Sequence, residues 1–314
     1  MSGSKYGDQR SFIEVINDVD SFVLNDSFYQ LITHDNTTCI GYISSTIANY
    51  FIGFDKYFKV NHQLKTITID SSFDTFETRN IMIADIANQW RSIKELDEQL
   101  NKGWRNELYT AYYPSTEPYF LVERSFSVLL GVVTYGVHLN GYIPANKSSN
   151  GKLKMWIPRR SPTKPTYPGM LDNTVAGGLG YPHGIWETVI KECFEEAGLS
   201  QEFIESHAKC VGVTSYLYKT KDGRVQPEVE YTYDIEFDNE FDVIPHPEDG
   251  EAEYFKLMDI DEILERLYNK EFKPNCGLII VDFLIRHGLI TPENEPHYFE
   301  IVNRCHRNLP FPTR

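Results

Sequence analysis

Residues 177–199 read Gly177-Gly-Leu-Gly-Tyr-Pro-His183-Gly-Ile-Trp-Glu-Thr-Val-Ile-Lys191-Glu-Cys-Phe-Glu-Glu-Ala-Gly198-Leu199, which predicts a glycine turn, a short loop and one helix that ends at a glycine. On that helix Glu192, Glu195 and Glu196 stand at i, i+3 and i+4, so their carboxylates share one face. Like charges held this close repel one another unless a cation lies among them. Because hard oxygen ligands suit Mg²⁺ or Mn²⁺, the spacing predicts a site for a divalent metal ion.

The other side of the same helix is apolar at helical spacing. We expect a buried stripe there, made of Trp186, Ile190, Cys193 and Ala197. A solvated acidic helix is the alternative explanation of clustered glutamates. The double glycine before the helix and the glycine after it favour the metal site.

The stretch resembles the Nudix box, whose pattern is G-x5-E-x7-R-E-U-x-E-E-x-G-U, with U a bulky apolar residue. The positions that agree are Gly177, Glu192, Cys193, Glu195, Glu196, Gly198 and Leu199. Two positions depart, because His183 stands where the family has its first glutamate and Lys191 where it has arginine. Lysine keeps the positive charge but lacks the fork with which arginine orients a carboxylate.

The composition is that of a globular protein with room for two domains. The chain has 314 residues and a net charge of −15, which argues against a partner with a phosphate backbone such as a nucleic acid. Its five cysteines are scattered without a C-x-x-C pair, which favours reduced thiols. The N-terminal residues lack the apolar core of a signal peptide, and no apolar run is long enough to cross a membrane. We therefore expect a cytoplasmic protein without a membrane partner.

The pattern of the chain changes near Val122, and we expect an accessory N-terminal domain at 1–125 and a Nudix hydrolase domain at 126–314. Helices are expected at 9–18, 45–51, 75–93, 123–130, 259–268, 277–287 and 296–307. Strands are expected at 29–35, 39–44, within 57–70, and at 132–142, 152–160, 209–219 and 225–237. The resulting fold class is α+β: a Nudix α/β/α sandwich with a mixed sheet, preceded by a smaller α+β domain.

The resemblance extends to one branch of the family. The runs that carry it are 135–142, 156–161, 167–173, 272–277 and 283–288. They are similar to fungal and plant Nudix proteins whose domain is also found fused to thiamine pyrophosphokinase. The resemblance implies hydrolysis of damaged thiamine diphosphate, such as its oxo and oxy forms, to the monophosphate. It implies a small-molecule diphosphate as the partner and Mg²⁺ or Mn²⁺ as the cofactor.

The metal-binding set has further candidates outside the helix. The carbonyl of Gly177 or Gly178 is a candidate, because glycine lets the backbone approach a metal closely. Many Nudix domains add a carboxylate after the helix, and we rank Glu251 first for that role. The competing carboxylates are Glu253, Glu228 and Glu230. The sequence leaves open which glutamate acts as general base and how many metal ions bind.

Candidate substrate-binding residues lie on both sides of the expected domain boundary. Arg159, Arg160 and Lys164 precede the glycine turn and are candidate counter-charges for the diphosphate, with a solvated basic loop as the alternative. The aromatic run of Trp104, Tyr109, Tyr112 and Tyr113 is a candidate wall for a substrate ring, with ordinary core packing as the alternative. We take Trp104 as the residue to test.

Two other functions remain open from the sequence. Isopentenyl diphosphate isomerase shares the Nudix scaffold, but it uses a cysteine in a Thr-Asn-Thr-Cys run, whereas Cys276 here follows Pro-Asn. A Nudix fold that binds a ligand without catalysis is the second alternative, favoured by His183 and opposed by the three helix glutamates. The oligomeric state is unknown, as is any contribution of residues 1–125 to the active site.

Overall fold

The computed structural model describes residues 11–25 and 27–314 and is built around one mixed sheet. Its strands are β7 (Thr134–Ile143), β8 (Lys154–Arg160), β9 (Val175–Gly178), β10 (Ala208–Lys219), β11 (Val225–Glu236) and β12 (Ala252–Asp259). The strand order is β10-β11-β7-β8-β12, and β9 pairs with β7. Because β11 and β7 are parallel while the other pairs are antiparallel, the sheet is mixed as expected.

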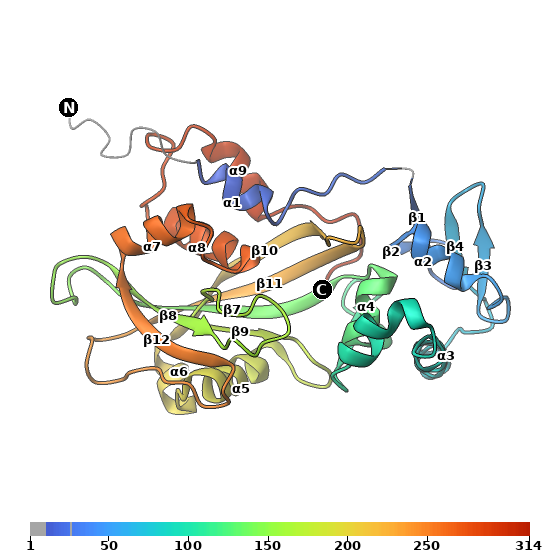
Figure 1. Cartoon of the computed structure of the whole chain (residues 1–314), viewed down its shortest axis with the longest axis horizontal. Coiled ribbons are helices and arrows are strands. Elements are labelled where there is room, and N and C mark those ends of the chain that lie inside the picture. The colour runs from blue at the N-terminus through green and yellow to red at the C-terminus, as the bar shows by residue number, and fades with distance from the viewer. Residues whose placement is uncertain (1–10, 26) are drawn as a thin grey trace.

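Helices cover both faces of this sheet, as Figure 1 shows. One face carries α5 (Ile185–Ala197) and α6 (Gln201–His207), and the other carries α7 (Ile260–Tyr268) and α8 (Pro274–Arg286). Two more helices, α1 (Ile13–Asn17) and α9 (Tyr298–Cys305), pack against α8. The α/β/α sandwich predicted from the sequence is therefore confirmed.

Helix α5 packs on the sheet through a narrower stripe than the sequence suggested. Val189, Cys193 and Ala197 are fully buried at i, i+4 and i+8. Trp186 is 40% exposed, so its place in the buried stripe was a wrong prediction. It lies in the first turn of the helix, where its ring is 5.8 Å from the ring of Tyr233 in β11. The helix ends at Gly198, whose φ of +63° is a left-handed conformation that favours glycine.

The N-terminal part of the chain forms a smaller α+β domain, coloured blue to teal in Figure 1. It contains β1 (Phe28–Ile32), β2 (Cys39–Ser44), α2 (Ser45–Ala48), η1 (Asn49–Phe51), β3 (Phe58–Asn61), β4 (Thr66–Ile69), α3 (Phe76–Trp90), η2 (Lys94–Leu96), η3 (Glu98–Lys102), β5 (Leu108–Tyr112), β6 (Pro118–Glu123) and α4 (Arg124–Leu130). Strands β1–β4 form a sheet in the order β2-β1-β4-β3, and β5 and β6 form a hairpin. Trp90 packs against Phe51 and Phe126 at the centre of this domain.

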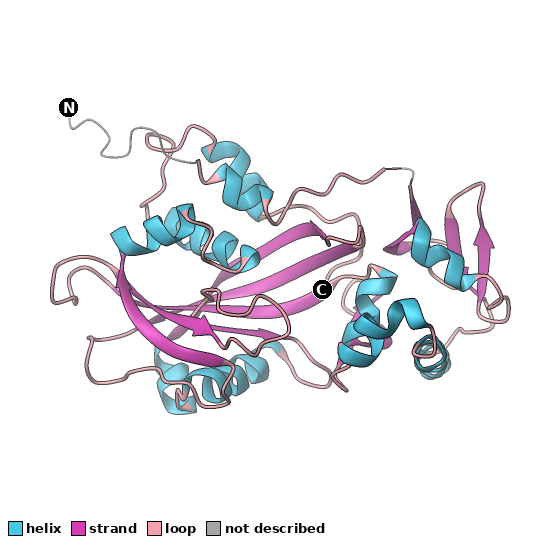
Figure 2. Cartoon of the chain, in the orientation of Figure 1, coloured by secondary structure: helices cyan, strands magenta, loops and turns pink. Residues whose placement is uncertain are grey.

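Most of the expected helices and strands are present with shifted ends, as Figure 2 shows by colour. The helix expected at 9–18 covers Ile13–Asn17, and residues 9–10 lie outside the described residues. The strands β5, β6, β9 and β12 and the helix α6 were missed. In the described part of the chain, no helix has the length and apolar character to cross a membrane. All five cysteines are free thiols, in agreement with the sequence.

The two parts of the chain are joined at more than one place. Helix α4 spans the expected boundary at residues 125 and 126, and α1 packs on α8 and α9 instead of on the domain that follows it. Phe12 and Ile16 belong to the apolar core beneath α8. The division at 125 and 126 stays a prediction.

Candidate active site

The site is built on the turn that follows β9. Gly177 lies opposite Val137 of β7, and a Cβ at Gly177 would lie 2.3 Å from Cγ and 2.7 Å from Oε2 of Glu192. A side chain there would push the Glu192 carboxylate away from the strand. Glycine at this position therefore lets the Glu192 side chain lie directly against the backbone at the end of β9.

Glu196 reaches the same strand one turn of helix further on. Its Oε2 accepts a hydrogen bond from the N–H of Ala176 at 2.9 Å. Burial raises its pKa well above the ordinary value, and the negative charge of Glu192 adds to this effect. Burial also raises the pKa of Glu192, and the nearby charges of Glu195 and Glu107 act in the same direction. Negative charge is thus concentrated at low solvent exposure, where a cation would stabilise it.

Lys191 lies between two of the helix carboxylates. Its Nζ is 2.9 Å from Oε1 of Glu192 and 2.8 Å from Oε2 of Glu195. Although burial disfavours its charge, the hydrogen bonds to Glu195 and Glu192 raise the pKa of Lys191. The lysine at the arginine position of the box therefore does orient two carboxylates, one through each contact.

The donor chemistry of the site fits a hard divalent cation. Glu192, Glu195 and Glu196, with the carbonyl of Gly177, offer oxygen ligands of the kind that Mg²⁺ and Mn²⁺ prefer. In the described residues, no three His, Cys, Asp or Glu side chains are gathered closely enough to hold a metal ion as they stand. Binding of a cation would therefore require Glu192 and Glu195 to exchange the Lys191 ammonium for the metal.

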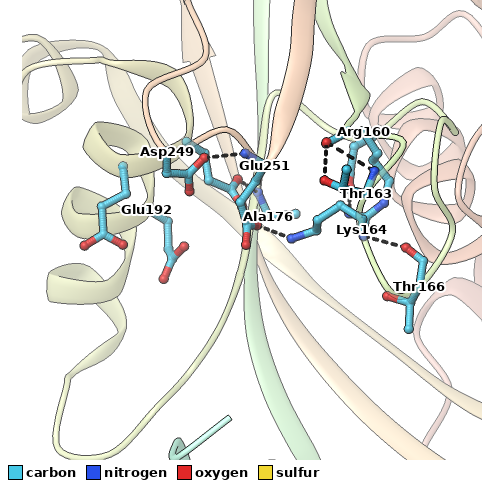
Figure 3. A network of polar contacts seen from close by, with 12 residues as sticks. Arg160, Thr163, Lys164, Thr166, Ala176, Glu192, Asp249 and Glu251 are labelled. Carbon is cyan, nitrogen blue, oxygen red and sulfur yellow. Dashed lines mark hydrogen bonds and ion pairs between the residues drawn. The ribbon is translucent and has the colours of Figure 1, made fainter. Parts of the chain in front are cut away.

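Glu251 is a further carboxylate near the helix glutamates. Glu251 lies just before β12, and its backbone N–H donates to Asp249 Oδ1 at 2.8 Å. A small pocket is lined by both Glu196 and Glu251, together with Arg160, Asp172 and Thr174. Figure 3 shows Glu251 between Glu192 on its helix and the loop that carries Arg160 and Lys164. Of the four carboxylates weighed outside the helix, Glu251 is the one that the structure brings into a pocket with the helix glutamates.

Glu228 and Glu230 lie in a different environment. Both accept hydrogen bonds from the hydroxyl of Tyr216, on the face of the sheet opposite α5. The Nε2 of His138 is 3.7 Å from Oε1 of Glu230. This buried polar cluster was not expected, because His138 is 78 residues before Tyr216 and each member alone resembles a strand residue. Neither carboxylate lines the pocket of Glu196 and Glu251, although Oε2 of Glu230 lies near Gly136, which pairs with Gly178 of β9.

The basic residues before the turn are engaged with the protein itself. Arg160 is in an ion pair with Asp172, with 2.6 Å between NH1 and Oδ2, and also donates to the carbonyls of Thr166 and Tyr167. Arg159 donates to the hydroxyl of Tyr254 at 3.0 Å and to the carbonyl of Gly169 at 2.8 Å. These bonds hold the loop between β8 and β9 in place.

Lys164 belongs to the same loop and forms an ion pair with Glu251. It is thus the one basic candidate of the three that contacts a predicted metal ligand directly, as the dashed line in Figure 3 shows. A role for Arg159, Arg160 or Lys164 in binding phosphate stays a prediction. The geometry favours Lys164, because its partner Glu251 is a candidate metal ligand.

The aromatic run of the N-terminal domain divides into residues with different partners. Trp104 stacks beneath Arg91, with 4.4 Å from the guanidinium carbon to the ring centre, and its Nε1 donates to Asn106 at 2.9 Å. Tyr109 instead lies over the glycine turn, since a Cβ at Gly178 would lie 2.2 Å from its hydroxyl. The role proposed for Trp104 stays a prediction, and Tyr109 is the aromatic residue with a contact at the turn.

A mixed sheet between helices, with the glutamates of α5 beside a glycine turn, is the arrangement that the resemblance to the Nudix box predicted. The sequence matches the family described as the NUDIX domain over residues 147–276 and a domain of unknown function, DUF4743, over residues 12–134. The chain belongs to the Nudix hydrolase family. This assignment supports an enzyme over a binding module, and a hydrolase over an isomerase.

Named relatives cover most of the chain. Nudix hydrolase 20, chloroplastic, of Arabidopsis thaliana is 36% identical over 264 residues, which are 80% of this chain and 68% of that protein. Nudix hydrolase 24, chloroplastic, of the same plant is 35% identical over 270 residues, or 84% and 69%. An uncharacterized protein of Saccharomyces cerevisiae, YJR142W, is 44% identical over 328 residues, or 96% and 92%.

Solved structures are more distant. The MutT protein of Methanosarcina mazei is 14% identical and covers 49% of this chain and 95% of its own, with a TM-score of 0.36. The Deinococcus radiodurans protein DR0079 is 19% identical and covers 55% of this chain and 83% of its own, with a TM-score of 0.34. At these values the structures add nothing to the family assignment.

The environment of His183 predicts that replacing this side chain has little effect on the activity. Its side chain is 48% exposed, and its Nδ1 is 3.8 Å from the exposed Glu187 carboxylate. Substitutions of exposed residues usually change the free energy of unfolding by about 0.5 kcal/mol or less, so His183→Ala should fold normally. Because the carboxylate beside His183 is Glu187 and not one of the three helix glutamates at the turn, we expect the variant to keep most of its kcat. Steady-state kinetics of the purified variant test this. A loss of activity comparable to that of a helix glutamate variant would show that position 183 takes part in the chemistry.

Proposed function

We propose that this Nudix hydrolase converts oxidised or otherwise damaged thiamine diphosphate to the monophosphate and phosphate. The observation that carries the hydrolytic part is the convergence of Glu192 and Glu196 on the glycine turn, with Glu251 in the same pocket. The substrate class rests on the similarity of the runs at 135–142, 156–161 and 167–173 to the thiamine-related branch.

The proposed metal site consists of Glu192, Glu195, Glu196 and Glu251 with the carbonyl of Gly177. A divalent ion bound there would neutralise the charge of the diphosphate and lower the pKa of a bound water. The oxygen of water attacks the terminal phosphorus, the bridging P–O bond breaks, and the monophosphate leaves with the bond's electron pair. One carboxylate of the set accepts the proton of the attacking water, and we propose Glu251, which is ion-paired with Lys164, for that role.

The direct test compares oxo-thiamine diphosphate, intact thiamine diphosphate and ADP-ribose as substrates of the full chain with Mg²⁺ or Mn²⁺. We expect the damaged cofactor to be cleaved to monophosphate and phosphate with a kcat/KM at least about tenfold higher than the other two, a difference of about 1.4 kcal/mol in transition-state binding. Chromatography of the nucleotide and thiamine products measures this. EDTA should stop the reaction.

Two results would overturn the proposal in different ways. Preference for ADP-ribose would contradict the thiamine-related substrate and leave the diphosphate hydrolase intact. Full activity in excess EDTA would contradict the metal site itself. We also propose a cytoplasmic location, which microscopy of the tagged full chain can test.

A further inference from the structure

The accessory domain meets the catalytic turn through three consecutive residues. The carbonyl of Leu108 accepts a hydrogen bond from the N–H of Tyr181 at 2.7 Å. On one side of Leu108, the hydroxyl of Tyr109 lies over Gly178, and on the other side Oε1 of Glu107 would be 3.1 Å from a Cβ at Gly180. The first half of the turn between β9 and α5, at Gly178, Gly180 and Tyr181, is therefore in contact with the N-terminal domain.

The carboxylate of Glu107 is held in one orientation. Its Oε2 is 2.9 Å from NH1 of Arg124, and its carbonyl accepts from the backbone N–H of Arg124 at 2.9 Å. No described residue donates a hydrogen bond to its Oε1. One oxygen of Glu107 is thus fixed against α4, while the other faces the turn and is available to a ligand.

Glu107 and Glu192 flank the same short turn from two domains. Glu192 lies against Gly177 from the side of α5, and Glu107 lies against Gly180, three residues further on. Arg124 pairs with one oxygen of Glu107 and Lys191 with one oxygen of Glu192, so Oε1 of Glu107 is the oxygen left to face a cation at the turn. By contrast, the side chain of His183 is paired with Glu187 on the exposed end of the loop and brings no carboxylate to the turn.

We propose that Glu107 is a further carboxylate of the divalent-metal site, so that the active site is shared between the accessory and the Nudix domains. This inference rests on the metal-dependent hydrolysis proposed above. It assigns the accessory domain a chemical contribution: Leu108 and Tyr109 position the turn, and Glu107 adds an oxygen ligand to it. The ligand chemistry is that of a hard cation such as Mg²⁺ or Mn²⁺.

The test compares Glu107→Gln with Glu117→Gln in the full chain. Glu117 lies in the turn between β5 and β6 and is exposed, so it provides the same chemical change in the same hairpin away from the site. Calorimetric titration with Mn²⁺ alone, without substrate, measures the metal affinity. Since partners of a metal site typically change affinity by 10- to 100-fold, we expect Glu107→Gln to weaken Mn²⁺ binding and lower kcat by about tenfold or more, and Glu117→Gln to leave both within about twofold.

Thermal unfolding of each variant separates this effect from a loss of structure. If Glu107→Gln fails to fold, Glu107→Asp keeps the charge and the pairing group for Arg124 at a shorter reach, and it should then show the weakened Mn²⁺ binding. A folded Glu107→Gln that binds Mn²⁺ as tightly as the unmodified chain overturns the inference. A chain that binds Mn²⁺ normally but ignores thiamine analogues overturns the substrate proposal alone, whereas no Mn²⁺ binding at all overturns both.

Discussion

Glu196→Gln should lower kcat by at least about 100-fold, the scale of losing one preorganised charge that stabilises the transition state. Glu196 is the most buried of the three helix glutamates, and its Oε2 is fixed by the N–H of Ala176 at 2.9 Å. Glutamine has nearly the same shape and its amide oxygen can still accept that hydrogen bond. The variant therefore keeps the helix packed on β9 and removes the negative charge.

Steady-state kinetics with saturating Mn²⁺ measure the effect, and circular dichroism checks the fold. Glu202→Gln on α6 is a matched control, because it is an exposed glutamate on the neighbouring helix. It should keep kcat within about twofold, as exposed substitutions usually do. If Glu196→Gln and Glu202→Gln were equally active, the carboxylates at the turn would have no part in the reaction.

The catalytic helix could be predicted from the sequence because its signals are local. The glycine turn, the glutamate spacing and the stop at Gly198 lie within 23 residues, and α5 covers Ile185–Ala197. The same local signals did not decide which apolar residues are buried. Trp186 and Val189 both lie on helical faces, and the sheet packed against α5 decides that Val189 is covered and Trp186 is half exposed.

The fold was less predictable where elements are short or depend on distant partners. β9 has four residues, two of them glycine, and it is a strand because it pairs with β7 about 40 residues earlier in the chain. The strands β5 and β6 are rich in aromatic residues that resemble core or pocket residues equally well. Sequence spacing could not show that Glu107 and Tyr109 lie against a turn about 70 residues away, the observation from which we propose a shared active site.

The partners of the basic residues also depend on contacts that are distant in the sequence. Arg160 precedes the glycine turn, and charge alone suggests a phosphate partner. In the structure its side chain is 11% exposed and paired with Asp172, twelve residues further along the chain. Asp172 in turn accepts a hydrogen bond from the thiol of Cys276 at 2.6 Å. This distant contact makes Arg160 part of the wall of the pocket.

Asp172→Asn should therefore lower the free energy of unfolding by about 3–5 kcal/mol, the usual cost of leaving the partner of a buried ion pair uncompensated. Burial opposes the charge of Asp172, but Lys273 and Arg160 outweigh it and lower its pKa from 3.8 to about 2. Because the folded pKa is the lower one, this stabilisation is present above about pH 4 and is lost as the pH falls towards 2. Urea unfolding at pH 7 and at pH 3 measures both effects, and the difference between variant and unmodified chain should be smaller at pH 3.

Asp238→Asn provides the control, since Asp238 is exposed and pairs with Lys147 at 2.9 Å in solvent. Exposed pairs contribute roughly 0–1 kcal/mol, so this variant should unfold at nearly the same urea concentration as the unmodified chain. If Asp172→Asn behaved like Asp238→Asn, the ion pair with Asp172 would not be what holds Arg160 in the wall of the pocket. A large loss of stability confined to Asp172→Asn would instead identify Arg160 as a structural part of the pocket. Lys164 would then be the basic side chain of this loop that we propose to pair with the diphosphate.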